Sequence, residues 1–188
     1  MNGHQKQKEQ SGRMIEEALF LIMQKKPYAE ISVSEITRKA DLSRRTFYRL
    51  YHEKDEVLHC YFDRLCQEYC NQASTLEEYN ISQVTQEYFA FWYQYKENLL
   101  LMHRRGLDEM LYYEISQASR TVVKSRIGRE EEKNEEEVAY FADYSTGGFS
   151  MLLQRWIMEG MKEPPEQYAQ AVSRSLLKFI RPSRKNMN

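Results

Sequence analysis

The chain has 188 residues, of which 41% are apolar, 13% aromatic and 29% charged, and its formal net charge is −1. That length can hold one medium domain or two small ones, and the apolar share is sufficient for a packed core. No run approaches the roughly 18 apolar residues of a spanning helix, and the polar start MNGHQKQKEQSGR lacks the apolar stretch of a signal peptide, so the sequence predicts a cytoplasmic protein without a membrane partner.

The charge is distributed unevenly along the chain. Residues 1–60 carry eleven Lys or Arg against nine Asp or Glu, whereas residues 61–188 carry sixteen against nineteen. Within 38–54 there are six basic and two acidic residues. Because local potential attracts a polyanion more than the overall charge does, this pattern predicts that the N-terminal part contacts nucleic acid.

Nearly the whole chain has a helical pattern, since it contains seven glycines and four prolines and shows no sustained strand alternation. The first predicted helix covers about 10–26 and ends at Pro27. Its buried stripe recurs at helical spacing and consists of Met14, Ile15, Ala18, Leu19 and Ile22.

Two short capped helices follow in SVSEITRKADLSRRTFYRLYHEKDEVL, residues 32–58. Ser32 is placed to cap the first, with Glu35 completing a capping box, and Ser43 is placed to cap the second, 44–51. The second helix turns Phe47 and Leu50 inward and leaves four side chains outward: Arg44, Arg45, Tyr48 and Arg49. This arrangement is typical of a helix-turn-helix that enters the DNA major groove.

A long helix over 54–76, with Leu58, Phe62, Leu65 and Tyr69 on its inner face, leads into the rest of the chain. Further helices are predicted over 82–105, 108–127, 138–161 and 164–180. The acidic run 128–137 is predicted to be an exposed loop or a solvated helix end. The predicted fold is therefore all-α, with a helix-turn-helix domain at 1–53 and a second helical domain at 54–188 that the long helix joins to it.

Residues 31–58 resemble the head motif of the TetR/AcrR family of bacterial transcriptional regulators. The matching positions are Ile36, Ala40, Ser43, Phe47, Tyr48, Tyr51 and Lys54, and the departures from the motif are Thr37, Asp41 and Arg45. Asp41 stands where glycine is common and can adopt the left-handed turn conformation at modest cost. More loosely, YFADYSTGGFSMLLQRWIMEGMKEPPEQYAQ resembles one sub-branch of the family.

The candidate DNA-binding residues are Ser32, Ser43, Arg44, Arg45, Thr46, Tyr48, Arg49 and Lys54. Arginine can bind guanine edges in a bidentate way or can bind phosphate. The resemblance implies that Arg44, Arg45 and Thr46 approach bases. It also implies that Tyr48 and Lys54 contact phosphates of double-stranded DNA. The alternative is an ordinary solvated helix face.

Because one recognition helix reads few base pairs, useful specificity requires two copies, and a homodimer is expected. The last two helices are the candidate interface, through Phe149, Leu152, Trp156, Ala169, Val172, Leu176 and Phe179. Gly147 and Gly148 interrupt the first of these helices, and a close backbone approach would explain them. Each residue could equally belong to the intrachain core.

The aromatic-rich helix at 82–105 and its neighbours could line a pocket for a small apolar or aromatic effector. The candidates are Phe89, Trp92, Tyr95, Met102, His103, Tyr112, Tyr144 and Met151. An aromatic stripe is more often core than pocket, so ordinary packing is the competing interpretation.

His59, Asp63, Cys66 and Cys70 form a stripe, but four such positions extend about 16 Å along a helix, too far for one metal ion. Buried cysteines are the better interpretation, and neither a metal nor a cofactor is expected. No catalytic motif occurs, so an enzyme is not expected.

The sequence and the resemblance together predict a ligand-responsive regulator, with repression the usual role in the family, that binds a palindromic operator as a homodimer. One alternative is a helix-turn-helix coactivator or assembly factor whose C-terminal domain binds a protein. The other is a helical enzyme acting on a small molecule, which the missing catalytic set disfavours.

Overall fold

The structure is a computed structural model that describes residues 3–73, 80–127 and 134–180. Every regular element in these ranges is helical, which confirms the all-α prediction. In chain order the elements are α1 (Gly3–Met23), the 3₁₀ helix η1 (Tyr28–Glu30), α2 (Val33–Lys39), α3 (Arg44–Leu50), α4 (Lys54–Ala73), α5 (Ile81–Tyr93), α6 (Lys96–Arg104), α7 (Asp108–Ile127), α8 (Glu135–Met158) and α9 (Pro165–Ile180). None of the described helices is long and apolar enough to cross a bilayer.

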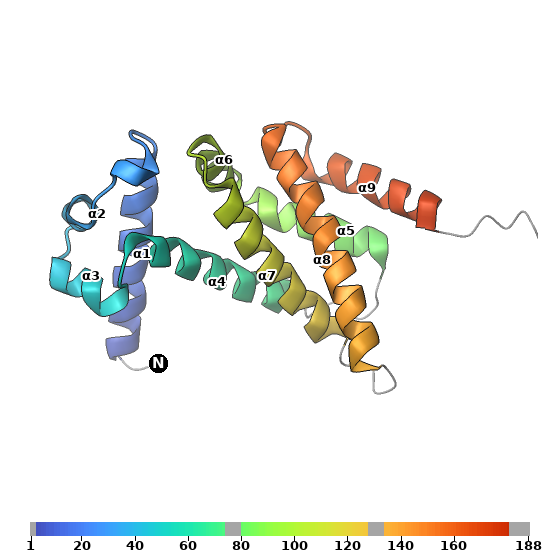
Figure 1. The fold of residues 1–188 in the computed structure, drawn as a ribbon, viewed down its shortest axis with the longest axis horizontal. Helices are drawn as coiled ribbons and strands as arrows, with labels where there is room; N and C mark the ends of the chain where they lie inside the picture. The colour runs from blue at the N-terminus through green and yellow to red at the C-terminus, as the bar shows by residue number, and fades with distance from the viewer. Residues whose placement is uncertain (1–2, 74–79, 128–133, 181–188) are drawn as a thin grey trace, which may run out of the picture.

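The first three helices gather at one end of the molecule and are called the head below (Figure 1). Their apolar faces meet around Ile15, Leu19, Ile36 and Phe47, all fully buried. α4 runs from the head into the remaining helices, called the body. In the body α4 packs on α7, α7 on α8, and α5 on α9.

The local sequence accounts for the ends of α2. The Ser32 hydroxyl accepts a hydrogen bond from the Glu35 amide at 3.3 Å, and the Ser32 amide donates one to the Glu35 carboxylate at 3.0 Å. This capping box satisfies two amides that the helix itself leaves unpaired. The sequence prediction for this helix start is confirmed.

The turn between α2 and α3 depends on Asp41. Its φ of 54° places it in the left-handed region, a conformation that the sequence analysis found aspartate able to adopt. The chain reversal lets the Leu42 amide donate to the Thr37 carbonyl at 2.9 Å, which satisfies an acceptor at the end of α2. A non-glycine residue pays a steric penalty in this conformation, which is smaller for aspartate than for most residues.

Several predicted helix ends need correction. α1 begins at Gly3 and not near residue 10, and α8 covers Glu135–Met158 in place of 138–161. Residues 135–137 of the acidic run therefore form the first turn of α8, where carboxylates favour the positive end of the helix dipole. The predicted end of the long helix, at 74–76, and residues 128–133 of the acidic run lie outside the described residues.

The predicted single helix over 82–105 is two helices, since the chain bends at Gln94 and Tyr95 between α5 and α6. Tertiary hydrogen bonds hold this bend. The Tyr95 hydroxyl donates to the Glu68 carboxylate of α4 at 2.6 Å, and the Lys96 ammonium donates to the Met161 carbonyl at 2.9 Å.

Aromatic side chains fill the body core. The Phe89 ring lies 5.6 Å from that of Trp156 and 4.9 Å from that of Tyr168, and the Trp156 and Tyr168 rings stack at 5.0 Å. Tyr88 joins α5 to α8 through its ring contact with Phe149 at 5.1 Å. Such pairs add stability beyond the area they bury, so these residues hold the body together.

Candidate nucleic-acid interface

α3 is a short helix held firmly at both its start and its inner face. The Ser43 hydroxyl accepts a hydrogen bond from the Thr46 amide at 3.0 Å, and the two hydroxyl groups lie 2.9 Å apart. Phe47 is completely buried and its ring packs 5.6 Å from that of Tyr51. The helix therefore cannot rotate about its axis without exposing Phe47.

This fixed orientation leaves the predicted DNA-facing side chains in solvent. Arg44, Arg45 and Arg49 are exposed, and Tyr48 is 50% exposed. The Arg44 guanidinium lies 5.8 Å from the centre of the Tyr48 ring, a weak cation–π contact. Within the described residues no ion pair occupies these three guanidinium groups, so they can bind phosphate or base edges.

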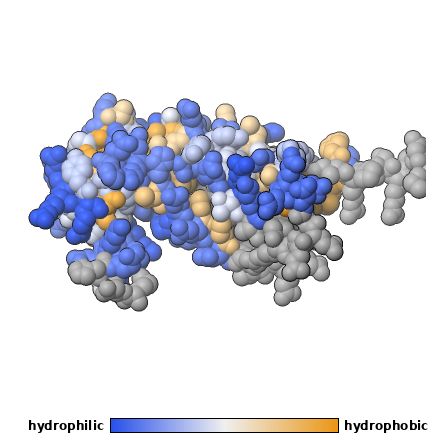
Figure 2. All heavy atoms as spheres, turned by 60° about the horizontal axis from the view of Figure 1, so that its bottom comes forward, coloured by the Kyte–Doolittle hydropathy of each residue, from blue (hydrophilic) through white to orange (hydrophobic). Residues whose placement is uncertain are grey.

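Figure 2 shows many strongly hydrophilic side chains, with a few apolar ones among them, on the visible face of the head end of the molecule. The exposed Arg38 and Lys39 at the end of α2 add two further cations beside the turn that leads to α3. A cluster of cations on one end of a chain that carries a net charge of −1 creates a local positive potential. The head therefore has the electrostatic character of a surface that contacts a polyanion.

Ser32 and Ser43 act as helix caps in this structure, and both residues remain exposed. Thr46 is half-buried at the start of α3. The structure thus brings Ser43, Arg44, Arg45, Thr46, Tyr48 and Arg49 together on one short segment, and it places Ser32 at the start of the neighbouring helix.

Lys54 differs from its expected role as a phosphate contact. Its ammonium donates to the carbonyl oxygens of Tyr28 (2.7 Å), Ala29 (3.3 Å) and Ile31 (3.2 Å), and it lies 4.4 Å from the centre of the Tyr28 ring. An ammonium has three donors, and all three are directed into the protein. Lys54 therefore ties the start of α4 to the segment around η1.

The residues predicted to line an effector pocket differ widely in exposure in the described structure. Phe89, Trp92 and Met102 are fully buried core residues, whereas Tyr144 (72% exposed) and Met151 (55%) face solvent. The remaining candidates, Tyr95, His103 and Tyr112, are half-buried. The effector pocket therefore stays a prediction.

The predicted dimer-interface residues divide in a similar way. Phe149, Trp156 and Ala169 are buried inside the chain, so for them the competing interpretation, intrachain core, is correct. Leu152, Val172 and Leu176 are half-buried. Phe179, at the end of α9, is 80% exposed.

An exposed apolar stripe on α8 was missed by the sequence reasoning. It consists of Tyr140, Tyr144, Met151 and Met158, which we call the α8 stripe. Their separations of four, seven and seven residues place them on one helix face. Gly147 and Gly148 lie between them, and a Cβ added at either position would meet nothing within 4 Å. The regular spacing was the signal that could have identified this face.

Burial raises the thiol pKa of two of the three α4 cysteines, Cys60 and Cys66. Burial raises the pKa of the Cys66 thiol to about 12, so it is protonated at neutral pH and a poor nucleophile. The nearby His59 ring nitrogen lies 2.5 Å from the carboxylate of the buried Glu114, which joins α4 to α7.

Comparisons with known proteins place these features in a family. Residues 80–178 match a TetR family model described as the transcriptional regulator C-terminal region, which is 99 of the 188 residues. The uncharacterised HTH-type transcriptional regulator YxbF of Bacillus subtilis (strain 168) is 26% identical over 165 residues, or 86% of this chain. The match spans 42% of the length of that relative.

The solved structure of the dihydroxyacetone kinase operon activator DhaS is similar in fold, with a TM-score of 0.60 over 89% of this chain and 94% of that one. At 17% identity this likeness supports the fold alone. The family model covers more than half of the chain. The helix-turn-helix, with the exposed cationic helix α3, lies in the N-terminal part that this model does not cover. The chain therefore belongs to the TetR family of transcriptional regulators.

Proposed function

We propose that the protein binds a palindromic operator as a homodimer, with α3 of each copy in the major groove. The observation that carries this proposal is the face of α3, where three guanidinium groups without an ion pair in the described residues stand beside a half-exposed tyrosine. Arg44 and Arg45, near the start of the helix, are the candidates for base edges, because the N-terminal residues of a recognition helix make such contacts. Tyr48 and Arg49 are the candidates for phosphates.

The α8 stripe supports the proposed dimer. Single exposed apolar residues are normal, but an ordered row of them on one helix marks an interaction surface. In a two-fold dimer this row would lie against the same row of the second copy. The two glycines would let the helix backbones approach closely there. Phe179, exposed near the end of α9, is a further apolar candidate for a contact between copies.

Two versions of the regulatory role differ in what the body binds. In the first, the dimer represses transcription until a small effector releases it from the operator. The effector does so by binding more tightly to the conformation in which the distance between the two heads does not match the operator half-sites. In the second, the α8 stripe binds a different protein and the chain acts as a coactivator or assembly factor. Light scattering tests the first version, which requires twice the chain mass of 22.6 kDa in solution. A monomeric mass would exclude it and leave the second.

The DNA assignment can be tested with a duplex selected from a random-sequence pool. Tyr48→Ala should weaken binding by a similar factor for all sequences, because it removes a backbone contact. Arg45→Gly should instead change the selected sequence, because it removes a base contact worth about 1–3 kcal/mol of discrimination. Lys162→Ala is the control, since it removes one exposed cation from the loop between α8 and α9.

Gel-shift titrations of the four proteins on the selected duplex and on scrambled duplexes give the measurement. If Tyr48→Ala and Arg45→Gly bind like Lys162→Ala, α3 is not the recognition helix. Circular dichroism spectra must match among the variants, which the exposure of all three side chains favours.

A further inference from the structure

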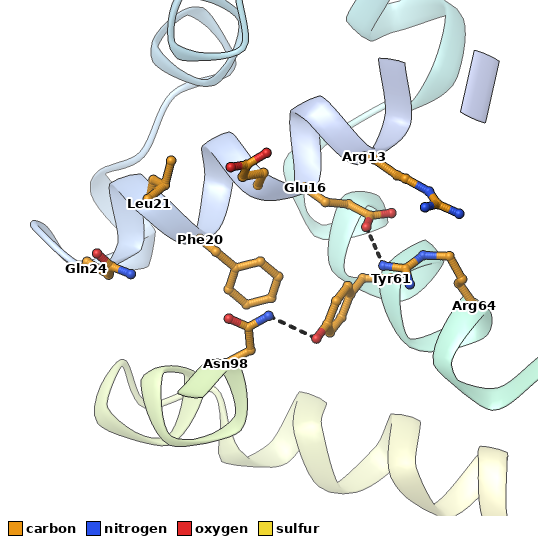
Figure 3. A pocket seen from close by; sticks show the side chains of 9 residues that line it. Arg13, Glu16, Phe20, Leu21, Gln24, Tyr61, Arg64 and Asn98 are labelled. Carbon is orange, nitrogen blue, oxygen red and sulfur yellow. Dashed lines mark hydrogen bonds and ion pairs between the residues drawn. The ribbon is translucent and has the colours of Figure 1, made fainter. Parts of the chain in front are cut away.

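A groove of about 370 Å³ lies between α1 of the head and α4 and α6 of the body (Figure 3). This volume is in the range of small-molecule sites. None of the residues predicted to bind DNA or an effector lines it. The groove is lined chiefly by Arg13, Glu17, Phe20, Gln24, Tyr61 and Asn98.

The middle of the groove is aromatic and rigid. The rings of Phe20 and Tyr61 meet edge to face with their centres 4.9 Å apart, and both side chains are largely buried. The Asn98 amide donates to the Tyr61 hydroxyl at 3.0 Å, which fixes that ring against α6. Figure 3 shows Gln24 and Asn98 at one end of these rings and Arg13, Glu16 and Arg64 at the other.

The ionic groups of the lining balance. Two guanidinium groups, Arg13 and Arg64, face two carboxylates, Glu16 and Glu17, so their formal charges sum to zero. Arg64 is already committed, because it donates to Glu16 at 2.6 Å and to Glu68 at 3.1 Å. A ligand that carried only a negative or only a positive charge would therefore leave one charged side chain of the lining without a partner.

Arg13 and Glu17 remain available. They lie one helical turn apart on α1, both are exposed, and no ion pair joins them to each other or to another described residue. One offers donors to a carboxylate and the other offers acceptors to an ammonium. The pair is thus complementary to a molecule that carries both charges.

We infer that this groove is a binding site for a small zwitterion of the amino-acid class, whose side chain lies on the Phe20 and Tyr61 rings. Its carboxylate binds Arg13 and its ammonium binds Glu17. The aromatic middle and the amides of Gln24 and Asn98 favour a side chain that is flat, apolar or amide-bearing.

The position of the groove gives the ligand a route to the head. The Arg105 side chain, just after α6, donates to the Met23 carbonyl at 2.5 Å and to the Gln24 carbonyl at 2.9 Å, at the end of α1. A molecule bound between α1 and α6 would lie beside this contact and could change the position of α1 relative to α6. Its differential affinity for two head positions would shift the dimer between DNA-binding states, a consequence that rests on the proposed function.

Isothermal titration of the full-length protein without DNA tests the site independently of any operator. The probes are L-phenylalanine and L-glutamine, with 2-phenylethylamine and 3-phenylpropanoate as analogues that each lack one of the two charges. At least one amino acid should bind with a dissociation constant of millimolar or below, as expected for a ligand of about ten heavy atoms. Each single-charge analogue should bind about tenfold more weakly, because it loses a charge-assisted hydrogen bond.

Arg13→Gln and Glu17→Gln should each weaken amino-acid binding about tenfold, whereas Lys6→Gln, an exposed change elsewhere on α1, should leave it unchanged. Equal melting temperatures would show that the variants fold alike. The inference is overturned if neither amino acid binds with a dissociation constant below about 10 mM. It is also overturned if the double variant, Arg13→Gln with Glu17→Gln, binds an amino acid as tightly as the unchanged protein does. A binding result with no DNA recognition would reject the proposed function and leave this site standing.

Discussion

Replacing Lys54 with methionine keeps the length and apolar stem of the side chain but removes its ammonium. Three carbonyls of the η1 segment then lose their donor, at distances of 2.7, 3.3 and 3.2 Å. A hydrogen bond to a charged group contributes about 1.5–3 kcal/mol net. The two longer bonds are weaker and Ala29 is exposed to water, so the three hydrogen bonds together contribute little more than one full bond. The contact of the ammonium with the Tyr28 ring adds about 0.5–1 kcal/mol.

A cation at the start of a helix opposes the helix dipole by about 0.3–1 kcal/mol, so its removal offsets part of the loss. The expected net destabilisation of Lys54→Met is therefore about 1–4 kcal/mol, which at its upper end is a large fraction of the usual total stability of a domain. Urea unfolding followed by circular dichroism measures it, and Lys162→Met, on an exposed loop, is the matched control.

The salt dependence of DNA binding distinguishes this structural role from a phosphate contact. If Lys54 serves the fold, the slope of log K against log salt stays the same in molecules that remain folded. If it neutralises a phosphate, that slope falls by about one. An unchanged urea midpoint together with a shallower slope would refute the structural role derived from the three carbonyls.

Three further predictions concern positions outside the recognition surface. Asp41→Gly should raise the free energy of unfolding by about 0.5–1 kcal/mol in urea titrations, because glycine adopts φ of 54° without the steric penalty, and a loss would show that the aspartate side chain itself stabilises the turn. Hydrogen bonds from Lys26 and Ser32 lower the pKa of Glu35 to about 2. The Glu35 carboxylate therefore contributes to folding stability above its ordinary pKa of 4.5, and this contribution is lost as the pH falls toward about 2. Glu35→Gln should lose less stability than the unchanged protein over this pH window, and parallel curves of stability against pH would contradict the prediction. Changing Gly147 and Gly148 to alanine should stabilise the helix by about 1 kcal/mol each in thermal melts and yet weaken the dimer in light scattering, whereas an unchanged dimer would place the contact elsewhere.

The head could be predicted closely because its signals are local. Ser32, Glu35 and Ser43 define helix starts through bonds that span three residues, so their identity and spacing are sufficient. The left-handed conformation of Asp41 follows from a turn that must reverse within a few residues. The exposed arginines of α3 follow from helical period once Phe47 is assigned inward.

The body could be predicted only as a set of helices. The bend at Gln94 and Tyr95 has no glycine or proline to mark it, and it depends on bonds to Glu68 and Met161, which are distant in sequence. The side of α5 that faces its neighbours could not be found from a pattern that is apolar nearly all round. The same uncertainty affects Tyr144, a pocket candidate whose side chain is 72% exposed.

The hydrogen bonds from Arg105 to the end of α1 bear on how this protein could be engineered. Together with the Glu16–Arg64 ion pair at 2.6 Å, they fasten α1 to the body at two separate points along its length. A fragment cut at residue 53 would abandon both attachments and expose the Phe20 ring that rests on Tyr61. The head is consequently not a domain that can be transferred by itself. A chimera that joins it to the body of another protein would need to carry the matching stretches of α4 and α6 as well.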